Sequence, residues 1–185
     1  MKELFEAVRA GDLARVQTLV DADPTLAIFA AAILGDTERL EELLTGNRSL
    51  VSALSSDGWT PLHLAAFFGK DGAVRLLLNK GAPVTARSTN QMANTPLHAA
   101  AAGKHADIVK LLLDHGASAN ARQHGGWVPL HSAAQNGDLE SARALIAAGA
   151  DASLRADNNQ KPLDLALTGA HQAMVEFLEA NGAKL

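Results

Sequence analysis

Apolar residues recur along this chain as pairs of short stripes at helical spacing. In residues 57–86 the apolar positions repeat every three to four residues, first over one short segment and then over a second. This spacing predicts two short helices, each with one buried face. The members of the two stripes are Leu62, Ala65 and Ala66, and then Val74, Leu77 and Leu78.

The residues around the stripes predict where each helix begins and ends. Thr60 directly before Pro61 is the arrangement of an N-cap followed by proline at the first helical position. Gly69 separates the two helices, and Gly81 is placed to end the second in a left-handed C-cap. Pro83 then prevents the helix from resuming. The unit is therefore a turn, a short helix, a loop, a second helix and an extended linker.

The same unit returns at a nearly fixed period. Pro61, Pro96, Pro129 and Pro162 are separated by 35, 33 and 33 residues, and a Gly-Ala pair stands 20 residues after each proline. A fixed period of this size indicates a stacked repeat architecture. In such a stack each unit buries its apolar face only against its neighbours.

The repeated motif resembles that of a known family. Residues 58–69 read Gly-x-Thr-Pro-Leu-His-x-Ala-Ala-x-x-Gly, and residues 76–82 read Leu-Leu-Leu-x-x-Gly-Ala; residues 95–121 repeat the pattern. This pattern resembles the ankyrin repeat and covers about residues 57–185 directly. The resemblance implies an all-α ankyrin-repeat solenoid of stacked helix pairs with short hairpin-like turns. It also implies a module that binds a protein partner on a concave face.

The N-terminal third is a degenerate form of the repeat. Ala31, Ala32 and Gly35 stand 34 residues before their counterparts in the next unit, but Ala27 replaces the motif proline. Residues 1–26 are predicted as a further helix pair, joined to the next unit without a full hairpin. We therefore expect one domain of six units, with atypical end units as caps. Their approximate ranges are 1–26, 27–54, 55–89, 90–122, 123–155 and 156–185.

Two local departures from the motif affect the loops. The unit that begins near residue 90 carries two extra residues within Arg87–Asn94, which predicts a longer hairpin tip. In two units the loop glycine comes one residue early, at Gly103 and Gly169, so that Lys104 and Ala170 occupy the usual glycine position. We expect strain in those loops without a change of fold.

Composition narrows the function classes. The net charge is −4 with both signs interspersed, which lacks the basic face that nucleic-acid binding needs. The chain has no cysteine, which excludes disulfides and thiolate metal sites. Residues 1–6 are charged and helical rather than typical of a signal peptide, and no apolar run approaches the length of a membrane span. We expect a soluble cytoplasmic protein that binds no cofactor, nucleic acid or membrane.

The seven histidines raise the question of metal binding or catalysis. His63, His98 and His131 belong to the repeated motif, and the resemblance implies that they bond to backbone near the hairpins. Neighbouring copies should be about 10 Å apart, too far to share a metal ion with ligand bonds of about 2 Å. No catalytic motif is present, so we expect no enzyme. Binding of a metal or small molecule by loop histidines remains the weaker alternative.

Counting from the motif places a candidate binding surface on the hairpin tips and the ends of the first helices. Its members are Trp59, Asn94, Trp127 and Gln160 at the tips; Phe67, Phe68, Gln135 and Asn136 at the helix ends; Ile33 and Leu34 in the degenerate unit; and Met92 in the longer hairpin. Both tryptophans fall at tips, and exposed aromatic groups mark interaction sites.

Two alternatives remain open for this surface. Trp59, Phe67 and Phe68 could instead pack inward against the degenerate unit, and Trp127 could lie flat along its own hairpin. The same apolar patch could also hold a second copy of the chain. We expect a monomer that binds an unidentified protein partner, with a weak homodimer as the alternative.

Overall fold

The computed structural model describes residues 1–184 and contains helices joined by loops, with no β-strand in that range. The all-α repeat architecture is thereby confirmed. The α-helices are α1 (Lys2–Arg9), α2 (Leu13–Ala22), α3 (Ala27–Leu34), α4 (Thr37–Gly46), α5 (Pro61–Phe67), α6 (Asp71–Asn79), α7 (Pro96–Ala102), α8 (Ala106–Asp114), α9 (Pro129–Asn136), α10 (Leu139–Ala147), α11 (Pro162–Thr168) and α12 (Gln172–Ala180). Three short 3₁₀ turns are η1 (Pro24–Leu26), η2 (Arg48–Ser52) and η3 (His124–Gly126).

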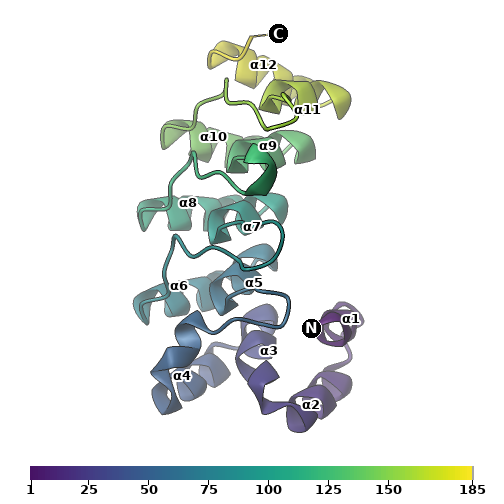
Figure 1. Ribbon diagram of the computed structural model, residues 1–185, viewed down its shortest axis with the longest axis vertical. Helices are drawn as coiled ribbons and strands as arrows, with labels where there is room; N and C mark the ends of the chain where they lie inside the picture. Colours follow the sequence, from purple (N-terminus) through teal and green to yellow (C-terminus); the bar gives the residue numbers. More distant parts are fainter. Residues whose placement is uncertain (185) are drawn as a thin grey trace.

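The helices from α3 to α12 form two parallel rows. Helices α3, α5, α7, α9 and α11 make an inner row, and α4, α6, α8, α10 and α12 make an outer row (Figure 1). The inner row packs closely because its facing positions are small: Ala65, Ala100 and Ala133 are fully buried between successive helices. One leucine in each motif, such as Leu62, is buried in the same core.

The helix starts follow the motif. The Oγ1 of Thr60 accepts a hydrogen bond from the backbone N–H of His63 at 3.3 Å, and Pro61 occupies the first turn of α5. Val128 replaces threonine before α9 and has no hydroxyl, but its backbone N–H still donates to Nδ1 of His131 at 3.2 Å. Lys104 and Ala170 have φ values of 61° and 54°, a left-handed conformation that is costly for a residue with a side chain and that agrees with the strain expected in these loops.

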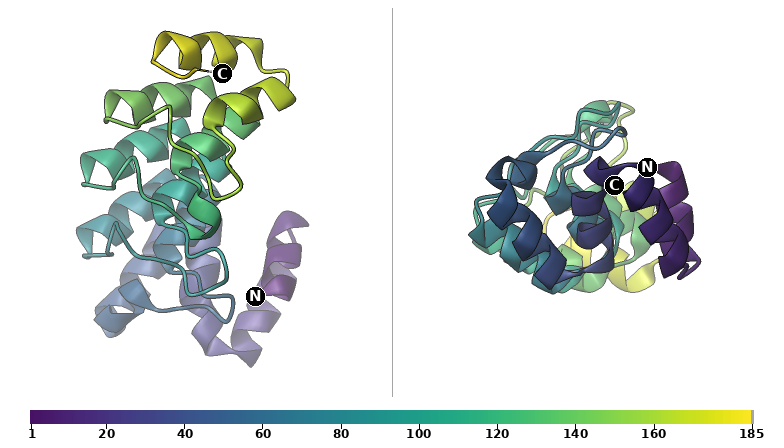
Figure 2. Two further views of the ribbon diagram at one scale, coloured as in Figure 1. Left: turned by 45° about the horizontal axis from the view of Figure 1, so that its top comes forward. Right: turned by 90° about the horizontal axis from the view of Figure 1, so that it is seen from below.

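The linkers between helix pairs form hairpins that project together from one side of the stack (Figure 2). Each hairpin closes with a backbone bond, for example from Ser88 N–H to the carbonyl of Asn94 at 2.9 Å. Successive hairpins are also bonded to one another: Thr89 N–H donates to Gly58 O at 2.9 Å, and His124 N–H donates to Met92 O at 2.8 Å. The hairpin side is thus a continuous hydrogen-bonded ridge.

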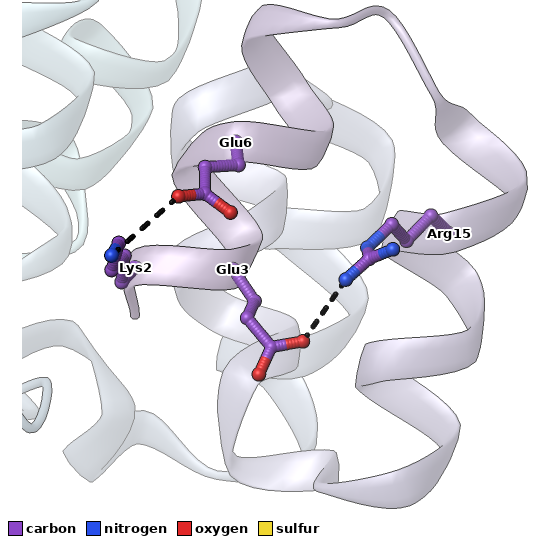
Figure 3. A network of polar contacts seen from close by, with 4 residues as sticks. All are labelled: Lys2, Glu3, Glu6 and Arg15. Carbon is purple, nitrogen blue, oxygen red and sulfur yellow. Dashed lines mark hydrogen bonds and ion pairs between the residues drawn. The ribbon is translucent and has the colours of Figure 1, made fainter.

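The N-terminal helix pair departs from this stack. Only residues 23–26 join α2 to α3, whereas residues 47–60 join α4 to α5. This short connection leaves α1 and α2 beside the inner row, on the side away from the outer row, instead of forming the next layer (Figures 1 and 2). Arg15 in α2 pairs with Glu3 in α1 at 3.2 Å, and Lys2 lies 4.0 Å from Glu6 (Figure 3).

Candidate functional site

An apolar pocket opens where α1 lies against the inner row. Its volume is about 120 Å³, and its lining comes from α1, the first hairpin and α5. The lining residues are Phe5, Arg9, Trp59, Leu64, Phe67 and Phe68. α1 reaches the end of α5 through the stack of Phe5 on Phe68, and both rings line the pocket.

The three aromatic residues predicted at this site have different environments. Phe67 is 36% exposed, and its ring stands at 80° to that of Phe68 with 5.3 Å between centroids. Phe68 is half-buried and stacks on Phe5 of α1 at 5.9 Å. Trp59 is half-buried with its ring 5.6 Å from the imidazole of His63. The inward-packing alternative thus describes Phe68 and also Trp59, since both pack in part against the buried core, while Phe67 faces solvent.

Two residues placed on the surface from sequence are buried, which corrects that placement. Ile33 is fully buried, because the N-terminal helix pair and α5 both pack on α3 and leave almost none of that helix free. Asn94 is 4% exposed; its Oδ1 accepts from the Ser88 hydroxyl at 2.6 Å, and its backbone N–H donates to Ser88 Oγ at 3.1 Å. Neither side chain is available to a partner. Leu34 is half-buried at the end of α3.

The remaining predicted residues lie along the later repeats and do not line the pocket. Met92 is 48% exposed at the tip of the longer hairpin. Trp127 is half-buried, with its ring 5.4 Å from that of His131. Gln135 is exposed, and the half-buried Asn136 donates from Nδ2 to Ala102 O at 3.2 Å. Gln160 is half-buried at the last tip.

Sequence reasoning missed three residues of the pocket, namely Phe5, Arg9 and Leu64. The apolar side of residues 4–8 was recognised as helical, but its neighbour was not. The only available signal was the short spacing between Gly11 and Gly35, which removes a hairpin. That spacing shows that the first pair is irregular without specifying the helix against which it packs.

Comparison with known protein families matches "Ankyrin repeats (3 copies)" over residues 4–88, 84–156 and 123–185. The chain belongs to the ankyrin repeat family. Ankyrin repeats are generally modules of protein–protein interaction. The family match includes residues of the displaced helix pair, so α1 and α2 belong to an ankyrin repeat that has lost its hairpin.

The curated relatives share ankyrin sequence over part of their length. "Ankyrin repeat and SAM domain-containing protein 6" of Rattus norvegicus is 37% identical over 98 residues, which are 48% of this chain and 11% of that protein. The Mus musculus protein of the same name is 38% identical over 98 residues, with the same coverage. "Delta-latroinsectotoxin-Lt1a" of Latrodectus tredecimguttatus is 38% identical over 64 residues, 34% of this chain and 5% of that protein.

The three ankyrin-motif histidines hold successive repeats together. Nε2 of His63 lies 3.0 Å from Asn94 O in the next hairpin, so this nitrogen carries the proton and donates. Its Nδ1 then accepts from the hydroxyl of Thr60 at 2.7 Å. The corresponding Nε2 contacts are His98 to Trp127 O at 3.2 Å and His131 to Gln160 O at 3.1 Å.

Burial keeps these motif histidines neutral. Loss of hydration lowers the pKa of His63 and of His98 to about 4, although each ring bonds to a carbonyl that favours the charged form. Burial lowers the pKa of His131 in the same direction. A neutral imidazole with both nitrogens bonded to its surroundings is a structural tie between ankyrin repeats rather than a base open to substrate.

The loop histidines make similar contacts. His105 Nε2 lies 3.0 Å from Phe67 O, and His171 Nε2 lies 3.1 Å from Gln135 O, one repeat away in each case. Nδ1 of His115 lies 2.8 Å from Leu111 O in its own helix. Within residues 1–184, no three His, Asp or Glu side chains converge as metal ligands. In the same range, no helix is long and apolar enough to cross a membrane.

Proposed function

We propose that this ankyrin-repeat domain is a non-catalytic module that binds a protein partner through the pocket between α1 and α5. The supporting observation is the pocket itself, which is almost wholly apolar in its lining residues and has Phe67 exposed at its edge. A contiguous apolar patch on a folded surface marks an interaction site, whereas single exposed apolar residues do not. Aromatic residues in such positions supply much of the binding energy in protein interfaces.

The size of the pocket favours an amino-acid side chain as its occupant. Its volume of about 120 Å³ is well below the roughly 300–1,000 Å³ of pockets that enclose drug-sized ligands. A single large apolar side chain of a partner would suit it. Arg9 lies at the rim and forms no ion pair within residues 1–184, so a carboxylate beside the apolar anchor would be favoured.

The state and location of the module follow from the same proposal. We expect a monomer in the absence of its partner, with a weak homodimer through the same apolar residues as the alternative. The lack of cysteine fits a reducing compartment, and we propose the cytoplasm.

The test is selection of binders from a display library of random twelve-residue peptides, followed by affinity measurement on variants. Phe67→Ser removes the exposed ring and leaves the Phe5–Phe68 stack in place. Leu167→Ser is the matched control, since Leu167 is 45% exposed at the end of α11, far along the stack. We expect Phe67→Ser to weaken the selected peptides about tenfold or more, which is about 1.4 kcal/mol, and Leu167→Ser to leave them unchanged.

Two results would contradict this proposal. Equal binding by wild type and Phe67→Ser would show that the pocket is not the site. A concentration-dependent dimer of wild type in sedimentation, lost in Phe67→Ser, would assign the pocket to a second copy of the chain.

A further inference from the structure

Three arginines occupy the same place in successive hairpins. Arg87, Arg122 and Arg155 each stand directly before the residue whose N–H closes its hairpin, namely Ser88, Gln123 and Ala156. All three arginines are exposed. We call this set the arginine ladder. It runs along the hydrogen-bonded ridge, whereas the aromatic pocket lies between α1 and α5.

Backbone carbonyls hold the ladder in an ordered form. Arg87 Nη1 donates to Ala93 O in its own hairpin at 3.0 Å and to Arg122 O in the next at 2.8 Å. Arg122 repeats this arrangement: its Nη1 donates to Gly126 O at 3.3 Å, and its Nη2 donates to Arg155 O at 2.8 Å. Arg155 Nη1 donates to Asn159 O at 3.0 Å. The guanidinium groups are therefore fixed at one per repeat before any ligand binds.

The carbonyl contacts leave the charges of the ladder unneutralised. No carboxylate within residues 1–184 forms an ion pair with any of the three arginines. Each arginine has five N–H donors, and only one or two of its nitrogens are used. Asp57 and Asp157 lie in the same set of hairpins without pairing with the ladder. The unused donors and the positive charge can therefore meet a ligand from solvent.

The acidic residues of the stack gather on other elements. Most of those from α4 to α12 lie in the outer-row helices: Glu38, Glu41, Glu42, Asp71, Asp107, Asp114, Glu140, Glu176 and Glu179. These helices also carry four basic residues, Arg39, Arg75, Lys110 and Arg143, so nine acidic against four basic residues leave the outer row negative by five charges. The hairpin ridge carries the three ladder arginines against Asp57 and Asp157 and is positive by one charge. This separation would steer an anionic segment toward the hairpins.

We propose that the arginine ladder binds an extended acidic segment of a partner protein, with carboxylates at every third residue. Adjacent repeats are about 10 Å apart, the distance between packed helices. A segment in the polyproline II conformation rises about 3.1 Å per residue with three residues per turn, so every third side chain lies on the same face and meets the next guanidinium. Arginine pairs with carboxylates through parallel N–H bonds, which suits this recognition.

The preceding hairpin gives the segment a direction. Leu54 occupies the ladder position there and is 50% exposed, so an apolar contact precedes the three charges. Nucleic acid fits less well, because its phosphates are spaced more closely than the repeats and the net charge of the chain is negative. This inference rests on the proposed function in that it takes the chain to bind proteins, but it uses residues outside the pocket.

The experiment compares two synthetic twelve-residue peptides of identical composition. One has glutamate at every third position with serine and threonine between, and the other has its four glutamates consecutive. We expect wild type to bind the first peptide more tightly than the second, with affinity that falls as salt is raised. Arg122→Gln should weaken the first peptide about tenfold, since one charge-assisted contact is lost.

Matched variants separate binding from a purely structural role. Arg75→Gln is the control for loss of one positive charge, because Arg75 is exposed on α6 and pairs with Asp71 at 2.8 Å, away from the hairpins; it should bind as wild type does. Arg122→Lys keeps the charge without the fork and should be intermediate. If Arg122→Gln fails to fold, Arg155→Gln replaces it, since within residues 1–184 the Arg155 side chain donates only to its own hairpin.

Several outcomes would overturn the ladder proposal. The first is that wild type binds neither peptide, or binds both with the same affinity. The second is that Arg122→Gln, or Arg155→Gln in its place, binds the first peptide as tightly as wild type does. The third is that wild type binds a single-stranded oligonucleotide more tightly than the first peptide. The pocket proposal is tested separately, because Phe67→Ser should retain the acidic peptide. If Phe67→Ser loses the display-selected peptides and wild type does not bind the acidic peptide, the ladder proposal is refuted and the pocket proposal stands.

Discussion

Lowering the pH from about 7.5 to about 5 should destabilise the stack through its motif histidines. His63 and His98 have folded-state pKa values of about 4 because burial removes hydration from the charged ring. In the unfolded chain the pKa is about 6.5. Between these two pKa values the unfolded state binds more protons than the folded state. The free energy of unfolding is therefore highest above the unfolded pKa, and it decreases as the pH is lowered toward the folded pKa.

The magnitude follows from the width of this pH window. At pH 5 the unfolded imidazole is about 1.5 pH units below its pKa, and the folded one is still mainly neutral, so each histidine costs about 2 kcal/mol. His63 and His98 together give about 4 kcal/mol, and His131 adds a loss of the same sign. This is a large part of the roughly 5–15 kcal/mol that stabilises a typical domain.

The assay is urea unfolding at both pH values, followed by the helical circular dichroism signal. His63→Gln removes one titrating group and should reduce the pH-dependent loss by about 2 kcal/mol, whatever its effect at pH 7.5. His124→Gln is the control, since His124 is exposed at the hairpin. Protonation of carboxylates is common to all three proteins and cancels. The same loss in His63→Gln as in wild type would refute the reasoning.

Two further predictions concern single positions in the loops and helices. Lys104→Gly should stabilise the protein by about 0.5–1 kcal/mol in thermal unfolding, because Lys104 has φ 61° and glycine adopts this conformation without strain. Ala102→Gly, at the end of α7, should instead destabilise the protein. If Ala102→Gly were the more stable of the two variants, the backbone of Lys104 would not be strained. Ser141→Ala should be neutral or stabilise by up to about 1 kcal/mol in urea unfolding, because the Ser141 hydroxyl is buried and has no hydrogen-bond partner among residues 1–184. A clear loss of stability would show that this hydroxyl has a partner.

Helix starts and loop conformations depend on residues that are close together in the chain, so the sequence alone predicts them. Thr60 and Pro61 start α5 because a cap and a proline act within one helical turn. Lys104 is left-handed because it stands where the motif has glycine, and the loop geometry is imposed by the two helices beside it. The histidine ties follow in the same way, since each repeat meets the next at a fixed offset.

Tertiary structure alone decided the pocket and the true surface. Phe5 and Phe68 are 63 residues apart and meet only because residues 23–26 are too short to place α1 beneath α3. That arrangement also buries Ile33, whose motif position is exposed at the end of other inner helices. Periodicity specifies contacts between equivalent positions of adjacent units, so it carries no information about a unit that has lost its hairpin. The place of α1 depends instead on which exposed apolar surface its own apolar side can cover.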